Sequence, residues 1–339
     1  MKKLAAILLS MLCITAAACS SGGQTDLSSV VSDGSVNTAV SATVSEEVSQ
    51  EETKTDSTVS KEDDNMIAED LTVLDLPYGN DRTVKVRVYV PAHQEGETLP
   101  VIYMTDGQNL FEDTTVRFGC WYTREAVRAE QEKNGRGAVI VGIHNDGDEV
   151  QRTIDLTPAS IGELNLSEET MTNREKELYA MFHPAAEAFT EFVVNTVMPA
   201  VEQQFPVKTG RTNTAFCGSS SGGLESFFIA LSYPDKFSAA GVFSPAMMYY
   251  SLDTWTAWVK SKMQDTMPFL YCYAGRGEAR EEYLANELEP MFAMLQTVYP
   301  QPDKLLKKVI DEDQMHNESA WEVYFVDFLK DFLDITASS

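Results

Sequence analysis

Short, continuous runs of apolar residues that alternate with helical patterns are the feature that most constrains the fold of this chain. Such runs are typical of strands buried on both faces of a parallel sheet. They are LPVIYMTD (99–106), GAVIVGIH (137–144), TAFCG (214–218), AAGVFS (239–244) and PFLYCYAG (268–275), preceded by the alternating segment TVKVRVYV (83–90). Helical patterns cover roughly residues 121–133, 185–204, 222–232, 281–297 and 318–334. This order predicts an α/β fold, a doubly wound and mostly parallel sheet with helices on both faces.

The chain begins with a secretory signal that is followed by a cysteine. Two lysines precede the apolar run Leu4–Ala18, which is too short for a stable membrane span. The end of this run resembles a bacterial lipobox, although Ala16 stands where leucine is usual. We expect a lipoprotein-type signal over residues 1–19, with acyl chains on Cys19 that hold the protein at the extracellular face of the cell membrane. The alternative is an ordinary signal peptide on a secreted or periplasmic protein.

Residues 20–65 differ in composition from the rest of the chain. They contain no aromatic residue and carry ten acidic side chains against two lysines, which predicts a disordered acidic tether. Residues 66–339 are then expected to form one α/β domain. The formal net charge of −26 argues against nucleic acid or anionic lipid as a partner, so membrane contact is expected through the lipid anchor only.

The cysteines of the domain indicate no metal chemistry. Cys120, Cys217 and Cys272 have no metal-like spacing, and the last two lie in apolar runs. We expect Cys217 and Cys272 to be buried thiols rather than a disulfide. The sequence implies no metal and no cofactor, and it leaves the oligomeric state open.

The segment AFCGSSSGGLES (215–226) contains one serine with a glycine two positions away on each side. Gly218 to Gly222 reads G-x-S-x-G with Ser220 in the middle. An expected strand ends just before it and an expected helix starts just after it, which is the arrangement of a nucleophile elbow. A glycine-rich phosphate-binding turn is the alternative, but no lysine follows Gly222 or Gly223. Ser220 is therefore the predicted nucleophile.

A serine nucleophile needs a base, and only one of the four histidines, His316, follows Ser220 in the chain. His316 lies after the expected last strand LLKKVI and before the final helix, which is where hydrolases with such an elbow place the base. Glu278 follows the run PFLYCYAG and is the predicted acid, which would fix the tautomer of His316. Other acidic residues remain alternatives, namely Glu281, Glu282, Asp311 and Asp313.

The negative oxygen formed during attack on an ester needs two backbone N–H donors. One is expected from Ser221, directly after the nucleophile, and the other from the loop TDGQNLF (105–111). Gln108 is the predicted donor in that loop and Asn109 is the alternative. The polar stretch 145–183 is expected to lie over the carboxyl ends of the strands, as a cap or loop at the edge where open α/β sheets bind ligands.

Several segments together resemble the putative-esterase family of α/β hydrolases, which includes esterase D, enterochelin esterases, and acetylxylan and feruloyl esterases. They are VIYMTDGQNLF (101–111), VGIHNDGDEVQRTIDLTP (141–158), CGSSSGG (217–223), YPDKFSAAGVFSPA (233–246) and MHNESAW (315–321). The resemblance implies an α/β-hydrolase fold, ester hydrolysis through an acyl-enzyme, and a triad of Ser220, Glu278 and His316. The chain departs from the family where MMYY follows Ala246 and where the acid is Glu rather than Asp.

The leading hypothesis is a surface-tethered serine esterase that acts on acetyl or feruloyl esters of carbohydrate. A siderophore lactone esterase and an acyltransferase with the same site are alternatives, and a non-catalytic glycan-binding module is a third class. Candidate substrate contacts are Asn109, Arg152, Met247, Met248 and Tyr249. A Met/Tyr run such as residues 247–250 is more often ordinary core.

Overall fold

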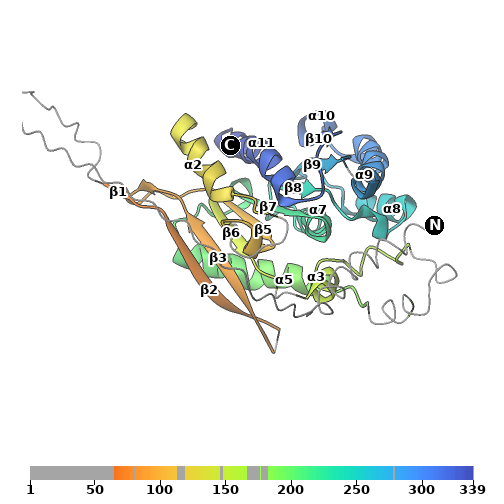
Figure 1. The fold of residues 1–339 in the computed structure, drawn as a ribbon, viewed down its shortest axis with the longest axis horizontal. Coiled ribbons are helices and arrows are strands. Elements are labelled where there is room, and N and C mark those ends of the chain that lie inside the picture. Colours follow the sequence, from red (N-terminus) through yellow and green to blue (C-terminus); the bar gives the residue numbers. More distant parts are fainter. Residues whose placement is uncertain are drawn as a thin grey trace, which may run out of the picture.

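A computed structural model describes residues 65–338 apart from residues 80, 113–118, 146–147, 166–175, 177–181 and 278. Its centre is an eight-stranded sheet with the order β10-β9-β8-β7-β5-β6-β3-β2 (Figure 1). The strands of this sheet are β2 (Asp70–Tyr78), β3 (Arg82–Val90), β5 (Val101–Thr105), β6 (Val139–Ile143), β7 (Thr214–Ser219), β8 (Ala239–Phe243), β9 (Phe269–Gly275) and β10 (Leu306–Asp311). The predicted signal peptide, Cys19 and nearly all of the predicted tether lie outside the described residues.

The direction of the strands brings distant segments to one edge. The six strands β6, β5, β7, β8, β9 and β10 run parallel to one another, whereas β3 runs antiparallel to both β2 and β6. The carboxyl ends of β5, β6, β7, β8, β9 and β10 therefore meet at the same edge of the sheet. A separate antiparallel pair joins β1 (Met66–Ile67) to β4 (His93–Gln94).

Helices cover both faces of the sheet. On one face α2 (Thr123–Asn134) and α11 (Glu318–Ala337) pack against the strands. The helices of the other face are α5 (Ala186–Phe192), α6 (Met198–Gln204), α7 (Ser221–Ser232), α8 (Leu252–Lys262) and α9 (Ala279–Val298). Shorter elements are η1 (Gly107–Asn109), α3 (Glu149–Asp155), the π-helical turn η3 (Val193–Val197), η4 (Arg211–Asn213), η5 (Met247–Tyr249) and α10 (Pro302–Leu305).

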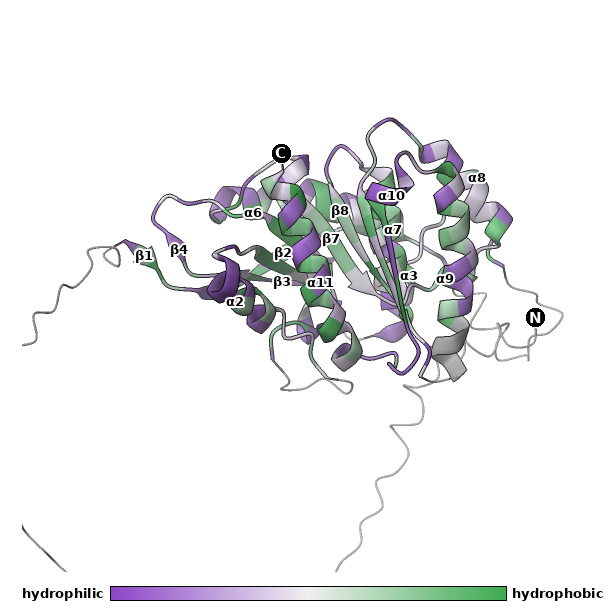
Figure 2. Ribbon diagram, turned by 90° about the horizontal axis from the view of Figure 1, so that it is seen from above, coloured by the Kyte–Doolittle hydropathy of each residue, from purple (hydrophilic) through white to green (hydrophobic). Residues whose placement is uncertain are grey.

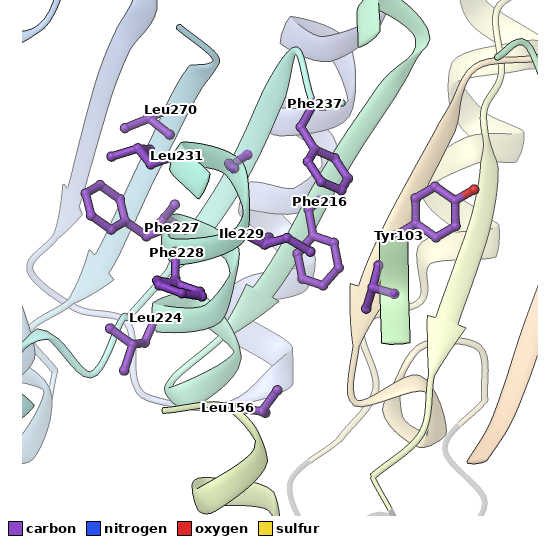
Figure 3. Packing of buried hydrophobic residues seen from close by; sticks show 14 of the residues in the cluster. Tyr103, Leu156, Phe216, Leu224, Phe227, Phe228, Ile229, Leu231, Phe237 and Leu270 are labelled. Carbon is purple, nitrogen blue, oxygen red and sulfur yellow. The ribbon is translucent and has the colours of Figure 1, made fainter. Parts of the chain in front are cut away.

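The alternation of side chains along the strands explains why two layers of helices are needed. In β5, Tyr103 packs into the core on one face while Ile102 and Met104 pack into the core on the other. Figure 2 shows apolar strands at the centre and hydrophilic residues along the outward sides of helices such as α2. Helix α7 is buried almost all round, and Figure 3 shows its Ile229 beside Phe216 of β7. The predicted fold class is confirmed.

The structure differs from the sequence-based expectation in a few elements. Strand β2, helix α3 and helix α8 were not predicted, and the expected helix 185–204 is interrupted by the π-helical turn η3. Strand β2 lies at the edge of the sheet and keeps part of its surface exposed, so it lacks a continuous apolar run. Part of the stretch 145–183 is helical, and most of its second half lies outside the described residues.

Within the described part of the chain, Cys217 and Cys272 are buried and form no disulfide, as predicted, and Cys120 is also buried. None of the helices in these ranges is long and apolar enough to cross a membrane. The same residues contain no group of three or more His, Cys, Asp or Glu side chains arranged to hold a metal ion.

Candidate active site

Unusual backbone conformations gather at the carboxyl edge of the sheet. Five non-glycine residues have positive φ among the described residues, and three of them directly follow neighbouring parallel strands. They are Asp106 (φ 57°) after β5, Ser220 (φ 59°) after β7 and Ser244 (φ 38°) after β8. Such conformations are unfavourable for residues with a side chain, and they concentrate at functional sites. This edge is therefore the first place to look for chemistry.

Ser220 is fixed in its strained conformation by backbone hydrogen bonds on both sides. Its N–H donates to the carbonyl of Phe243 at the end of β8, with an N–O distance of 3.0 Å. Its carbonyl accepts from the N–H groups of Leu224, at 3.0 Å, and Ala246, at 3.1 Å. Because β7 ends at Ser219 and α7 begins at Ser221, Ser220 occupies a sharp strand-to-helix turn, the geometry of a nucleophile elbow.

The two glycines of the G-x-S-x-G motif are required by a close approach from β5. A Cβ atom added to Gly218 would lie 2.4 Å from Oγ1 of Thr105, and one added to Gly222 would lie 2.2 Å from the same atom. Both distances are far below ordinary van der Waals contact. The motif thus lets the end of β5, and the loop that follows it, pack directly against the turn that holds Ser220.

Two backbone N–H groups at this edge are candidate hydrogen-bond donors for an oxyanion. Ser221 is the first residue of α7, so its N–H has no carbonyl partner one turn earlier in the helix. In the loop after β5, the N–H of Asn109 already donates to the carbonyl of Asp106 at 2.8 Å. This bond makes Gln108 the better donor of the two predicted alternatives. The Gln108 side chain accepts a weak hydrogen bond from the N–H of Asn145 at 3.4 Å.

A buried ion pair holds the loop after β5 in place. Arg152 of α3 makes a bidentate contact to Asp106, with Nε–Oδ1 at 2.6 Å and Nη2–Oδ2 at 2.7 Å. Its Nη2 also donates to the carbonyl of Ser219 at 3.3 Å, and Asn145 donates to Asp106. Burial opposes the charge of Arg152, but the adjacent Asp106 carboxylate more than offsets burial and raises the pKa of the guanidinium. The guanidinium of Arg152, a predicted substrate contact, thus links this loop to the elbow through its hydrogen bonds to Asp106 and Ser219.

His316 lies in the loop between β10 and α11, at the same edge as Ser220. Its ring packs edge-on against Trp321, with centroids 5.0 Å apart. The indole Nε1 of Trp321 donates to Oγ of Ser244 at 3.2 Å, and Ser244 directly follows Phe243, whose carbonyl binds the N–H of Ser220. The structure therefore connects the predicted base to the elbow through the end of β8.

The predicted acid Glu278 lies outside the described residues, and the side chains of Glu281 and Glu282 are not described either. The loop that leads to Glu278 does meet the His316 loop, since the N–H of Gly277 donates to the carbonyl of Gln314 at 2.8 Å.

Asp311, one of the alternative acids, is engaged within its own loop. Its carboxylate accepts hydrogen bonds from the hydroxyl of Tyr324 and from the N–H groups of Asp313 and Gln314. The Tyr324 hydrogen bond is the main reason that the pKa of Asp311 is lowered. Asp313, the other alternative in this loop, is exposed.

Three of the remaining candidate substrate contacts lie in the core. Met247, Met248 and Tyr249 form η5 and are only 1–3% exposed. The ring of Tyr249 stacks on Phe182 at a centroid distance of 6.1 Å. This burial is what ordinary core packing requires, and it leaves the three side chains little surface with which to line a pocket. The partly buried Asn109 contacts Glu318 through its side chain.

Asp106 and Glu318 belong to this edge but were not singled out in the sequence. Glu318 begins α11, is 5% exposed and accepts a hydrogen bond from Nδ2 of Asn109 at 2.8 Å. Burial raises the pKa of Glu318 from 4.5 to about 7, against the opposing effect of its hydrogen bonds. The available signals were an acidic residue that directly follows an apolar run, at Asp106, and an acidic residue two positions from His316, at Glu318.

The raised pKa of Glu318 predicts a pH dependence of stability. Between pH 4.5 and pH 7 the folded protein keeps this proton while the unfolded chain loses it, so stability must fall as the pH rises through this window. The total loss is about 3 kcal/mol at neutral pH and above. Glu318→Gln is expected to remove this slope, measured by urea denaturation at about pH 5 and about pH 8. Parallel slopes for the wild type and the variant would contradict the prediction.

The sheet order, the two helical layers and the strand-to-helix turn with its serine define the α/β-hydrolase class. The model of the family described as "Putative esterase" matches residues 79–332. The chain therefore belongs to this family, a family of carboxylic ester hydrolases, and the resemblance seen in the sequence is confirmed.

Relatives of known activity are esterases. The siderophore triacetylfusarinine C esterase of Aspergillus fumigatus is 28% identical over 220 residues, which cover 60% of this chain and 66% of that protein, just under two thirds of its length. The siderophore hydrolase EstB from Aspergillus nidulans has a TM-score of 0.56 at 20% identity, over 78% of this chain and 96% of that one. A ferulic acid esterase has a TM-score of 0.53 at 12% identity, over 79% and 99%. The two structures show likeness of fold.

Proposed function

We propose that this protein is a serine esterase in which Ser220 is the nucleophile, His316 the general base and Glu278 the acid that orients the histidine. The observation that carries this proposal is the strained backbone of Ser220 at a strand-to-helix turn, directly before the first N–H groups of α7. This conformation costs free energy, and a turn without chemistry would not need a non-glycine residue there.

The reaction proceeds in two halves. Ser220 Oγ attacks the ester carbonyl while His316 takes the hydroxyl proton, and the N–H groups of Ser221 and Gln108 bind the negative oxygen of the tetrahedral intermediate. When this intermediate collapses, the alcohol leaves with the proton from His316 and the acyl group stays on Ser220. His316 then takes a proton from a water, whose oxygen attacks the acyl-enzyme. The carboxylic acid is released as Ser220 Oγ takes that proton from His316, which restores the serine hydroxyl.

As the substrate we propose a siderophore ester or lactone, because the sequence relative in Aspergillus fumigatus is an esterase of such a compound and aligns with 60% of this chain. The second candidate is a feruloyl or acetyl ester of carbohydrate. It is supported by the ferulic acid esterase structure, which is matched over nearly its whole length. Transfer of the acyl group to a sugar instead of water would use the same steps with a different acceptor.

The N-terminal sequence supports an extracellular location for the reaction. Acyl chains on Cys19 would anchor the protein to the extracellular face of a bacterial membrane, and the acidic segment 20–65 would give the domain reach. Such an enzyme meets substrates outside the cell.

Hydrolysis of a small panel of esters tests the proposed substrate. The purified chain is incubated with triacetylfusarinine C, enterobactin, methyl ferulate and p-nitrophenyl acetate, and the released acids are quantified. We expect kcat/KM for a siderophore ester to exceed that for methyl ferulate by at least about 100-fold, since substrate-specific contacts add to the common chemistry. A higher kcat/KM for methyl ferulate would instead support the second candidate, an ester of carbohydrate. No turnover of any ester would contradict the serine esterase itself.

A further inference from the structure

The contact between Asn109 and Glu318 joins two loops that are 209 residues apart in the sequence. Nδ2 of Asn109, in the loop after β5, donates to Oε1 of Glu318 at 2.8 Å. Asn109 directly follows Gln108, the proposed oxyanion donor, and Glu318 lies two residues after His316, the proposed base. The contact therefore lies between two parts of the machinery that must act on the same substrate atoms.

The backbone of Asn109 is held at both ends, so its position is transmitted to Gln108. Its N–H donates to the carbonyl of Asp106 at 2.8 Å, and its carbonyl accepts from the N–H of Trp121 at 2.9 Å. The side-chain hydrogen bond to Glu318 adds a third fixed point. A displacement of Glu318 would therefore shift the peptide that carries the Gln108 N–H.

The first turn of α11 contacts both loops at once. Asn317 caps the helix by accepting from the N–H of Ala320 at 3.1 Å, which fixes the start of the helix. One turn carries Glu318, which binds Asn109, and Trp321, which packs against His316. This turn is thus the rigid element that sets the distance between the oxyanion loop and the base.

Glu318 is a poor choice if stability alone is considered. It is 5% exposed, and among the described residues its Oε2 has no hydrogen-bond partner. Burying a carboxyl group with one unsatisfied oxygen costs free energy that an apolar side chain of similar size would not cost. Asp106 disfavours its charge and Arg152 favours it. Because Glu318 lowers the stability of the fold beside the proposed catalytic residues, we expect it to serve the reaction.

We propose that Glu318 is a positioning residue, which acts through Asn109 to hold the Gln108 loop in register with His316. This proposal rests on the proposed function. It predicts that the pair affects the chemical step more than ground-state binding, because a displaced donor loses contact with an oxygen that becomes negative only during attack.

The test compares Glu318→Ala, Asn109→Ala, the double variant and Glu318→Gln, with Ser319→Ala as the matched control on the exposed side of the same turn. Each alanine variant is expected to lower kcat by about 10- to 100-fold while KM stays within about 3-fold, the effect of misaligned catalytic groups. The double variant should be no slower than the slower single variant, since both remove one contact. Glu318→Gln should keep at least about a third of kcat, because its amide oxygen still accepts from Asn109.

Three results would each overturn the positioning role of Glu318. They are a wild-type kcat in Glu318→Ala, losses of kcat in the two single variants that multiply in the double variant, and a kcat of Glu318→Gln as low as that of Glu318→Ala. If Glu318→Ala does not fold, Asn109→Ala and Glu318→Gln carry the same comparison. Ser220→Ala distinguishes a failure of the proposed esterase function from a failure of the positioning role of Glu318. A wild type that hydrolyses no ester, or a Ser220→Ala at full rate, overturns the proposed function and the pair with it. A hydrolysis rate that needs Ser220 but is unchanged in the Glu318 and Asn109 variants overturns only the positioning role.

Discussion

Replacing Ser220 by alanine is expected to lower kcat for ester hydrolysis by at least about 10⁴-fold, the scale of loss when a serine hydrolase is left without its nucleophile. The variant keeps the backbone that places the N–H of Ser221, so substrate binding should change little. Its fold should also persist, since the hydrogen bonds to Ser220 from β8 and α7 are made by main-chain atoms.

The neighbour Ser219 supplies a matched control for this prediction. Ser219→Ala lies in the same motif and is also buried, but its side chain has no role in the proposed chemistry. It should retain kcat within about 3-fold of the wild type, as for a conservative change away from the reacting atoms. If Ser220→Ala kept more than a small residual rate while Ser219→Ala lost it, the nucleophile would be assigned to the wrong serine.

The second large effect is expected on stability, at the ion pair between Arg152 and Asp106. Arg152→Met removes a guanidinium whose side chain is 13% exposed and leaves the Asp106 carboxylate, which is 8% exposed, without its bidentate partner. Breaking a buried pair in this way costs about 3–5 kcal/mol. Urea denaturation of the two proteins measures the difference. Because the pair also holds the oxyanion loop, kcat should fall as well.

Two further variants separate the ion pair from general damage. Asp106→Asn combined with Arg152→Met removes the unpaired charge, so it should recover part of the lost stability. Lys85→Met breaks an exposed pair, with side chains that are 56% and 59% exposed, and should change the unfolding free energy by less than about 1 kcal/mol. An Arg152→Met variant as stable as Lys85→Met would contradict the structural role assigned to this pair.

What the sequence predicts well here is local. The strands around the elbow are short apolar runs, and the G-x-S-x-G motif lies between one such run and a helix, so fold class and the position of Ser220 follow from adjacent residues. The two glycines illustrate the point: the motif predicted a tight turn, and the structure adds that Thr105 of β5 is the group that requires them.

The contacts that align the site are not local, and they were missed for that reason. Arg152 binds Asp106 across 46 positions, and Asn109 binds Glu318 across 209. No periodicity links such residues, because it is the order of parallel strands that brings their loops to one edge. Met247 and Met248 show the converse problem, since a Met/Tyr run that is compatible with a pocket is buried in the core.

The central claim, that Ser220 is the nucleophile of a serine esterase, is tested most directly by locating a covalent adduct. The purified protein is treated with a fluorophosphonate ester, digested and analysed by peptide mass spectrometry, with His316→Ala treated in parallel. We predict a single phosphonyl group on the peptide that contains Ser220, localised to that residue by fragmentation, and labelling slowed by at least about 100-fold without the base. An adduct on another serine, or an unlabelled protein, would contradict the account.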